Sequence, residues 1–266
     1  MNKPKKKRKR IWLAILIAFF IVSAGGYLGY LLFGQQMIQN HLRGLPGNAA
    51  QYEPENIESD PDSPLRGKTI IFLGSSVTRG YGACDTSFVE LLVQKDGVIA
   101  VKEAVGGTTL VTRNDESYIP RMEKIEPTIR ADAFVCQLST NDARGKLPLG
   151  TVSDSFDRSA FDTATVAGAL EYIVSYAQET WNCPVVFYTG TRYDSGHYGK
   201  MVALLHEIEA KWGCTVVDLW NDDALNNISE EQRKLYMLDD IHPTKAGYWE
   251  WWLEPIEAGL INAIEN

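Results

Sequence analysis

Five short apolar runs, separated by longer stretches with helical periodicity, constrain this chain more than any other feature. The runs are rich in β-branched and aromatic residues and occupy residues 68–74, 98–105, 133–139, 184–190 and 214–219. Runs that are apolar at nearly every position are typical of strands buried on both faces of a sheet. Helical patterns occupy residues 86–95, 162–180, 199–212 and 244 onward. The alternation predicts an α/β fold, a three-layer α/β/α sandwich around a five-stranded parallel sheet.

The first 34 residues predict a membrane anchor. Residues 1–10 contain seven Lys or Arg, and residues 11–34 contain no charged residue. A bilayer core requires about 20 apolar residues of helix, so this run is long enough to form one transmembrane helix. The basic flank should stay cytoplasmic, which predicts a single-pass, uncleaved signal anchor in the cell membrane with the remaining chain extracytoplasmic. A cleaved signal peptide, with its site near Val22-Ser23-Ala24, is the alternative.

The charge balance argues against a nucleic-acid partner. The basic run Pro4–Arg10 also resembles a nuclear import signal, but its position directly before an apolar span favours a role in membrane insertion. Seven of the 26 basic residues lie in this tail, which leaves 19 against all 34 acidic residues, a formal net charge of −15 for residues 11–266. Such a surface should repel nucleic acid.

The rest of the chain divides into a linker and one domain. Residues 35–66 are rich in proline and acidic residues and poor in apolar ones, which predicts a stalk without a core of its own. Residues 67–266 are enough for a single α/β domain with a substantial core.

Small and polar residues follow three of the predicted strands. Ser75 and Ser76 follow the first run, the pair Gly106-Gly107 follows the second, and Asn141 follows the third. Ligand sites of open parallel sheets lie at the carboxyl edge of the strands. We therefore expect these residues to converge on one edge of the sheet.

The segment Asp239-Asp240-Ile241-His242-Pro243 supplies what a serine at that edge would need for hydrolysis. A serine hydroxyl becomes a nucleophile when an imidazole takes its proton and a carboxylate holds that imidazole in the right tautomer. His242 and Asp239 are close enough to share one loop, while Asp240 is only two residues from the histidine and is expected to be solvated. Asn141 is the candidate side-chain donor to a developing oxyanion.

Each of these motifs alone has an ordinary structural explanation. A Ser-Ser pair after a strand is usually a turn, and an Asp-x-x-His-Pro segment is usually the start of a helix. The combination, in this order and at strand ends, favours catalysis. His206, which lies inside a helical pattern, is expected to be a surface or boundary residue.

Residues 67 to 255 resemble the SGNH hydrolases, the GDSL-type esterase and lipase superfamily. Its four blocks match Gly74-Ser75-Ser76, Ala104 to Thr109, Ser139 to Asp142, and Asp239 to Pro243. The resemblance implies a flavodoxin-like strand order and a Ser76, Asp239, His242 triad. It also implies an oxyanion hole formed by the backbone of Ser76 and Gly107 with the Asn141 side chain, although the register of Gly106 and Gly107 is open. This chemistry needs no cofactor and no metal.

The chain departs from the family pattern at two positions. Ser75 stands where the nucleophile block usually has aspartate, and Ser139 stands where the third block has glycine. The first change should alter support of the nucleophile loop. The second should narrow the pocket or change how Asn141 is aimed.

These observations predict a membrane-anchored extracytoplasmic serine esterase that hydrolyses acyl or O-acetyl esters of carbohydrate or lipid. Its partners would be the ester substrate and the membrane, the latter through residues 11–34. Two alternatives stay open. One is acyl transfer to a glycan through the same acyl-enzyme, and the other is a non-catalytic module on this fold that binds a glycan or a protein.

Two further expectations concern side chains away from the predicted site. Cys183 and Cys214 both precede predicted strands, so they either form a disulfide or remain two buried thiols. In the last helix Trp249 falls on an apolar stripe, whereas Trp251 lies off that stripe and is expected to be exposed.

Overall fold

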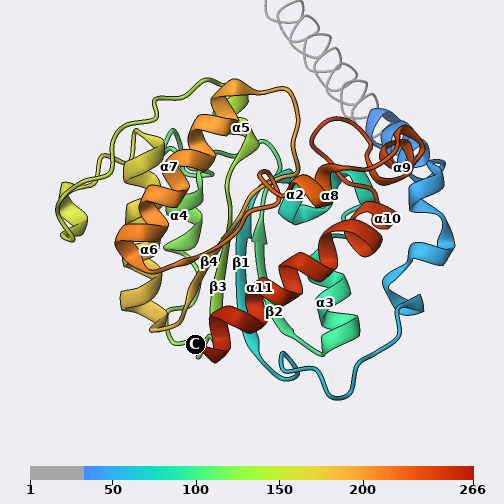
Figure 1. Ribbon diagram of the computed structural model, residues 1–266, viewed down its shortest axis with the longest axis horizontal. Helices are drawn as coiled ribbons and strands as arrows, with labels where there is room; N and C mark the ends of the chain where they lie inside the picture. Colours follow the sequence, from blue (N-terminus) through green and yellow to red (C-terminus); the bar gives the residue numbers. More distant parts are fainter. Residues whose placement is uncertain (1–32) are drawn as a thin grey trace, which may run out of the picture. The chain divides into compact units, whose positions relative to one another are not determined.

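The computed structural model describes residues 33–266, and its strands form one parallel sheet (Figure 1). The strands are β1 (Thr69–Gly74), β2 (Ile99–Ala104), β3 (Ala133–Gln137), β4 (Val185–Tyr188) and β5 (Thr215–Val217). Their order is β2-β1-β3-β4-β5, and every neighbouring pair is parallel. The five-stranded parallel sheet is confirmed, and its order is that of flavodoxin-like folds.

Helices cover both faces of this sheet. The longer ones are α3 (Phe88–Asp96), α6 (Val166–Trp181), α7 (Gly196–Trp212) and α11 (Leu253–Glu265). The shorter ones are α2 (Ser76–Arg79), α4 (Tyr118–Met122), α5 (Thr140–Arg144), α8 (Asp223–Asn226), α9 (Glu230–Tyr236) and α10 (Lys245–Gly247). Single turns are η1 (Pro46–Asn48), η2 (Ala50–Tyr52), η3 (Pro54–Asn56), η4 (Tyr81–Ala83), η5 (Arg158–Ala160) and the π-helical η6 (Tyr248–Trp252).

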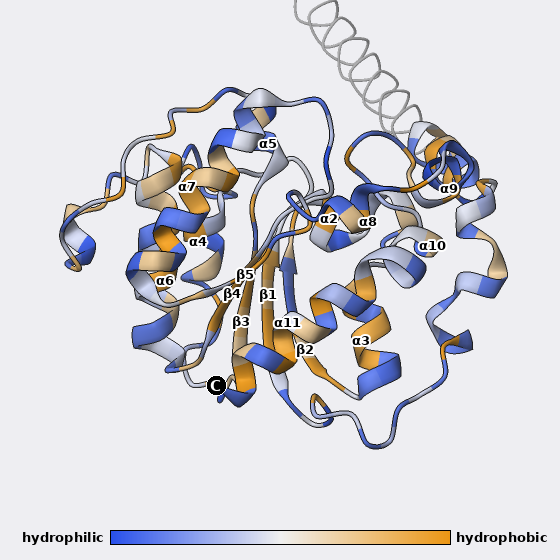
Figure 2. Ribbon diagram, viewed as in Figure 1, coloured by the Kyte–Doolittle hydropathy of each residue, from blue (hydrophilic) through white to orange (hydrophobic). Residues whose placement is uncertain are grey.

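Two hydrophobic cores follow from the alternation of side chains along each strand. Ile71 and Leu73 of β1 pack in the core formed with α4, α6 and α7. Ile70 and Phe72 pack in the other core, formed with α3 and α11. Because both faces are buried, the central strands are hydrophobic along their length (Figure 2), and the predicted sandwich has its three layers.

Residues 45–66 pack within this folded unit, whereas the sequence analysis places the start of the domain at residue 67. Residues 45–266 form one compact unit and residues 33–44 are assigned to another. Tyr52, Ile57 and Leu65 lie in the core on the α3 and α11 side. The segment is poor in apolar residues, but the few that it has are spaced to reach a core built by the rest of the unit.

The predicted membrane anchor lies outside the described residues except for positions 33 and 34. Residues 33–43 are helical. Within residues 33–266, no helix combines the length and the apolar character needed to cross a bilayer.

Cys183 and Cys214 are both buried free thiols, so the proposed disulfide does not form. The register of the two strands gives the reason. Val186 pairs with Thr215, which places Cys214 level with Val185, two residues beyond Cys183. With a rise of about 3.3 Å per residue and strands about 4.8 Å apart, the two Cα atoms are about 8 Å apart, beyond the reach of a disulfide.

Trp251 is buried rather than exposed as predicted. It is 5% exposed, and its indole Nε1 donates to the Leu225 carbonyl at 2.8 Å. The prediction assumed an α-helix through this region. Residues Tyr248–Trp252 instead form the π-helical turn η6, which changes the angle between successive side chains and directs Trp251 inward.

We predict that a chain beginning at residue 67 is much less stable than one beginning at residue 45. Burying a Leu or Ile side chain contributes about 1.5–3 kcal/mol, so deleting a segment that places three side chains in the core should lower the free energy of unfolding. Urea unfolding of residues 45–266 and 67–266 measures the difference. Leu65→Ala in the longer chain should cost about 2–5 kcal/mol, and equal midpoints for the two chains would contradict the assignment.

Candidate active site

The site begins at the sharp turn between β1 and α2. Gly74 ends the strand, and a Cβ atom there would lie 1.7 Å from Thr78 Oγ1 and 2.9 Å from Gln137 Oε1. Only glycine fits this approach. The chain then enters α2 with Ser76 as its first residue, which places the serine hydroxyl at the carboxyl edge of the sheet.

The three residues predicted as a triad meet at this edge in a continuous hydrogen-bonded network. Ser76 Oγ lies 2.8 Å from His242 Nε2. His242 Nδ1 lies 2.8 Å from Asp239 Oδ2. An ionised carboxylate only accepts hydrogen bonds, so Nδ1 carries the imidazole proton and Nε2 can accept from the serine hydroxyl. The network has the geometry that activation of a serine requires.

The carboxylate of Asp239 is fixed and ionised. Its Oδ1 accepts from the backbone N–H groups of Ile241 and His242, both at 2.8 Å. Burial alone would raise the pKa of Asp239, but the hydrogen bond and charge of His242 and the two backbone donors outweigh it and lower the pKa to about 2. The carboxylate therefore keeps its charge through the pH range in which imidazoles titrate.

The loop that carries Asp239 and His242 is closed on itself. An isolated antiparallel bridge joins Met237 to Pro243, and Leu238 N donates to the His242 carbonyl at 2.9 Å. The ring of Tyr81 packs edge-on against the imidazole at 5.1 Å. These contacts leave His242 little freedom to turn away from Ser76.

The glycine pair and Asn141 lie on adjoining loops next to the serine. A Cβ atom on Gly106 would be 3.7 Å from Ser76 Cβ, so this loop passes directly over the serine. Gly107 has a φ of +82°, a conformation that favours glycine. Asn141 Nδ2 donates one hydrogen to the Thr108 carbonyl at 2.8 Å, and the amide carries a second hydrogen.

Two buried residues hold these loops: Arg121, which the sequence analysis did not single out, and Asp142, which it placed in a matched block without a role. Arg121 donates to the Gly74 carbonyl at 2.8 Å and to Thr108 Oγ1 at 3.1 Å, so it ties the turn before Ser76 to the glycine loop. Asp142 accepts from the backbone N–H groups of Leu110 and Val111 at 2.9 and 3.0 Å. Burial raises the pKa of Asp142, and these backbone donors oppose the rise.

Gln137 is another residue that the sequence analysis missed. Its Oε1 accepts from Ser75 N at 2.9 Å and Thr78 N at 3.3 Å, as well as from the hydroxyl of Thr78 at 2.9 Å. One buried amide oxygen therefore positions both flanks of Ser76. The available signal was a glutamine inside the apolar run Ala133–Leu138, because a polar residue in a doubly buried strand needs a specific partner.

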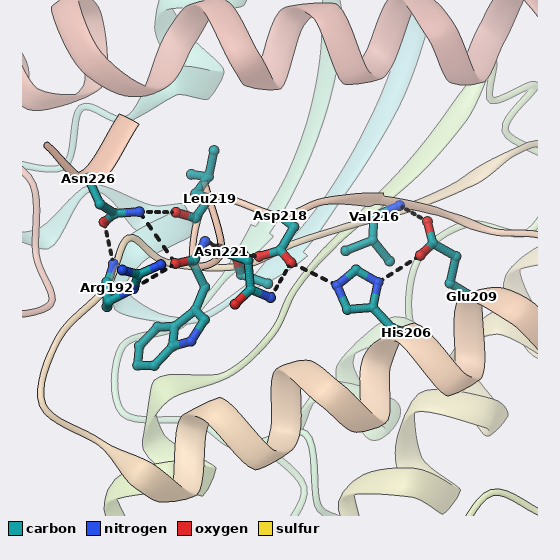
Figure 3. Close-up of polar contacts among 10 residues, drawn as sticks. Arg192, His206, Glu209, Val216, Asp218, Leu219, Asn221 and Asn226 are labelled. Atoms are coloured by element: carbon teal, nitrogen blue, oxygen red, sulfur yellow. Dashed lines mark hydrogen bonds and ion pairs between the residues drawn. The ribbon is translucent and has the colours of Figure 1, made fainter. Parts of the chain in front are cut away.

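A second histidine with carboxylate partners lies elsewhere, on α7 (Figure 3). His206 Nδ1 is 2.8 Å from Glu209 Oε2, and its Nε2 is 2.7 Å from Asp218 Oδ2. Burial would lower the pKa of His206, but the two carboxylates outweigh it and raise the pKa. Because both ring nitrogens face carboxylates, neither can accept a proton from a hydroxyl, and His206 serves as a link between α7 and the end of β5.

The comparisons with known proteins agree with the fold and identify the family. Residues 72–250 match the model of the GDSL-like lipase/acylhydrolase family. A protein from Lactobacillus plantarum has a similar structure, with 21% identity, a TM-score of 0.62, and coverage of 74% of this chain and 98% of that one. No curated protein matches the chain.

Two further solved structures are esterases. An acetyl xylan esterase is 16% identical with a TM-score of 0.52, covering 71% of this chain and 98% of that one. A family two carbohydrate esterase from Clostridium thermocellum, in complex with cellohexaose, is 15% identical with a TM-score of 0.53, covering 78% and 67%. The chain belongs to the GDSL-like lipase/acylhydrolase family and is a carboxylic ester hydrolase.

We predict that Gln137→Leu impairs the site far more than Gln137→Glu. Leucine removes the acceptor of two buried backbone donors, which lets the turn that carries Ser76 shift, and a misplacement of about 1 Å can lower kcat/KM by about 100-fold. Glutamate keeps an acceptor oxygen and should recover most of that loss. Aryl acetate hydrolysis and the rate of fluorophosphonate labelling measure the effect, and equal losses in the two variants would show that the amide oxygen does not position Ser76.

Proposed function

We propose that this protein is a membrane-anchored serine esterase whose Ser76, His242 and Asp239 form a catalytic triad. The observation that carries the proposal is the network in which Ser76 Oγ and His242 Nε2 are 2.8 Å apart and His242 Nδ1 and Asp239 Oδ2 are also 2.8 Å apart. The role of each residue follows from the atoms that it presents.

In the first half-reaction Ser76 Oγ attacks the ester carbonyl while His242 Nε2 takes the hydroxyl proton. Asp239 holds the resulting imidazolium through its bond to Nδ1. The tetrahedral intermediate collapses when the alkoxide leaves and takes the proton from Nε2. The products are a free alcohol and an acyl ester of Ser76.

The oxyanion would be stabilised by the backbone N–H groups of Ser76 and Gly107 and by the second hydrogen of the Asn141 amide. Gly106 lies against Ser76, and Asn141 is joined to the same loop at Thr108, so these donors border the serine. Preorganised donors of this kind each lower the barrier by about 3–4 kcal/mol.

In the second half-reaction His242 takes a proton from water, and the hydroxide oxygen attacks the acyl carbon. The second intermediate collapses with Ser76 Oγ as the leaving group, which recovers its proton from His242. The acid is released and the site returns to its starting state.

We infer that the alcohol part of the substrate belongs to a carbohydrate or another polar carrier, with a lipid as the alternative source. Beside the glycine loop lies a cavity of about 290 Å³ with polar walls that include Arg113, Asn114 and Glu116. Such walls suit a hydroxyl-rich leaving group. The similarity to an acetyl xylan esterase and to a carbohydrate esterase also supports a carbohydrate as the alcohol part of the substrate.

The membrane assignment rests on the sequence of residues 1–34. Seven basic residues precede an uncharged run at residues 11–34, the pattern of a signal anchor with its basic end in the cytoplasm. The esterase unit would then act outside the cytoplasm, where surface glycans and lipids carry acyl groups.

We predict that Ser76→Ala abolishes both labelling by a fluorophosphonate probe and hydrolysis of a short-chain aryl acetate, with kcat lowered by at least about 10,000-fold. Ser75→Ala is the matched control, because it removes the neighbouring hydroxyl. It should keep the label. Labelling that survives in Ser76→Ala would place the nucleophile elsewhere, and a folded wild-type protein that neither labels nor hydrolyses would favour a binding module.

We predict that the full-length protein stays with membranes after alkaline carbonate washing and that an impermeant protease added to intact cells degrades its esterase unit. A transmembrane span resists extraction because its apolar residues are held in the bilayer core. A chain lacking residues 1–34 should remain in the producing compartment as a soluble protein. A mature soluble form that begins near residue 25 would instead establish a cleaved signal peptide.

A further inference from the structure

The ring of Tyr81 touches the Ser76–His242–Asp239 network and yet remains exposed. Tyr81 is 37% exposed to solvent. Its ring centroid lies 5.1 Å from that of the His242 imidazole, with an angle of 64° between the two planes. Rings at this angle are not stacked, so at least one face of the tyrosine ring stays clear of the imidazole. An aromatic surface therefore faces solvent directly beside the histidine.

The backbone that carries this ring is held firmly. Asn48 Nδ2 donates to the Gly82 carbonyl at 2.8 Å, and a Cβ atom on Gly82 would lie 3.1 Å from His242 Cβ. Cys84 and Asp85 follow with φ angles of +56° and +66°. Residues other than glycine rarely adopt this conformation, and it persists where the surrounding structure imposes it, often at ligand sites. The exposed ring is thus presented by a rigid support.

The chemistry of the proposed reaction brings the alcohol part of the substrate to this side of the site. When the tetrahedral intermediate collapses, the bond between the acyl carbon and the alcohol oxygen breaks, and that oxygen takes the proton from His242 Nε2. The transfer requires the oxygen to lie within about 2.6–3.2 Å of Nε2. The first atoms of the alcohol therefore lie beside the imidazole, where Tyr81 is the neighbouring aromatic ring.

We propose that Tyr81 recognises the alcohol part of the substrate and that a pyranose ring of a carbohydrate packs on its free face. This inference rests on the proposed function and makes it more specific. An aromatic face suits the C–H groups of a sugar ring. The phenol Oη of Tyr81 has no hydrogen-bond partner among residues 33–266, so it is available to donate to or accept from a sugar hydroxyl.

The polar surroundings of the ring favour a sugar over a fatty alcohol. Arg79 and Asp85, on the same segment as Tyr81, form an exposed ion pair at 2.8 Å. The side chain of Asp239, bonded to the same imidazole, is 50% exposed. Sugar hydroxyls can replace the water around such groups, whereas a hydrocarbon chain would cover them without offering a hydrogen bond.

The test compares two esters that share an acetyl group and differ in the alcohol, a methyl mono-O-acetyl-xylopyranoside and ethyl acetate. Acetate release by the full-length protein in detergent gives kcat and KM for each. We expect kcat/KM of the wild type to be higher for the sugar ester by about 10-fold or more, mainly through a lower KM. Equal values for the two esters would overturn sugar recognition and leave the esterase proposal intact. A folded protein that hydrolyses neither ester and takes no fluorophosphonate label would overturn both.

Variants of Tyr81 test the ring itself. Tyr81→Leu removes the aromatic face and should lower the ratio of kcat/KM for the sugar ester to that for ethyl acetate by about 10-fold. Tyr81→Phe keeps the ring and should retain most of the wild-type ratio. Phe156→Ala is the matched control, because it removes a ring that is 62% exposed and packs on Trp212 instead. It should leave the ratio unchanged.

The split between kcat and KM separates substrate recognition from support of His242. If the ring acted only by holding the imidazole, Tyr81→Leu would lower kcat on both esters equally and leave both KM values unchanged, and the inference would be overturned. A rise in KM confined to the sugar ester would support it. The wild-type pair of esters gives its own answer even if Tyr81→Leu fails to fold.

Discussion

The turn between β1 and α2 is the constraint on which the rest of the structure depends. Its buried backbone groups need hydrogen-bond partners away from water. Arg121 donates to the Gly74 carbonyl, and Gln137 Oε1 accepts from the N–H groups of Ser75 and Thr78, on either side of Ser76. A buried polar group without a partner is costly, so the two side chains hold the turn in one conformation and with it the direction of the serine hydroxyl.

The histidine side of the network depends on a segment far away in sequence. Asn48 donates to the Gly82 carbonyl at 2.8 Å and accepts from Lys245 N at 2.9 Å. Gly82 lies just beyond helix α2, and a Cβ atom there would be 2.6 Å from the Pro243 carbonyl. One amide of the N-terminal segment thus links the segment after Ser76 to the segment after His242. This explains why residues 45–66 are part of the folded unit and not a spacer beside it.

The sequence was sufficient for features that depend on local pattern. Apolar runs revealed the five strands because both faces of the sheet are buried, and Asp239 and His242 could be recognised because three residues of one loop suffice to bring them together. Local pattern marks Gln137 only as a polar residue in an apolar run, and it marks Arg121 and Asn48 not at all. The roles of all three could not be recognised, since each acts on a partner more than 30 residues away. The burial of Trp251 was missed for a different reason, because a π-helical turn interrupts the period from which its exposure was projected.

The two departures from the family pattern are accommodated by local hydrogen bonds. Ser75 N and Oγ both donate to Gln137 Oε1, at 2.9 and 3.2 Å, so the serine takes part in holding the turn. Ser139 is fully buried, and its Oγ accepts from Asn141 N at 3.2 Å and donates to the Thr108 carbonyl at 3.4 Å.

Asn141 Nδ2 donates to that same carbonyl. The Ser139 side chain is therefore directed at the backbone that aims Asn141, and the narrowing of the pocket expected from it does not follow. A site that had lost its function would have no need to keep both serines bonded to the supports of Ser76 and Asn141. The two serines therefore support the loops at the carboxyl edge of the sheet. At the first position, a neutral pair of Ser75 and Gln137 holds the turn where the family usually has an aspartate.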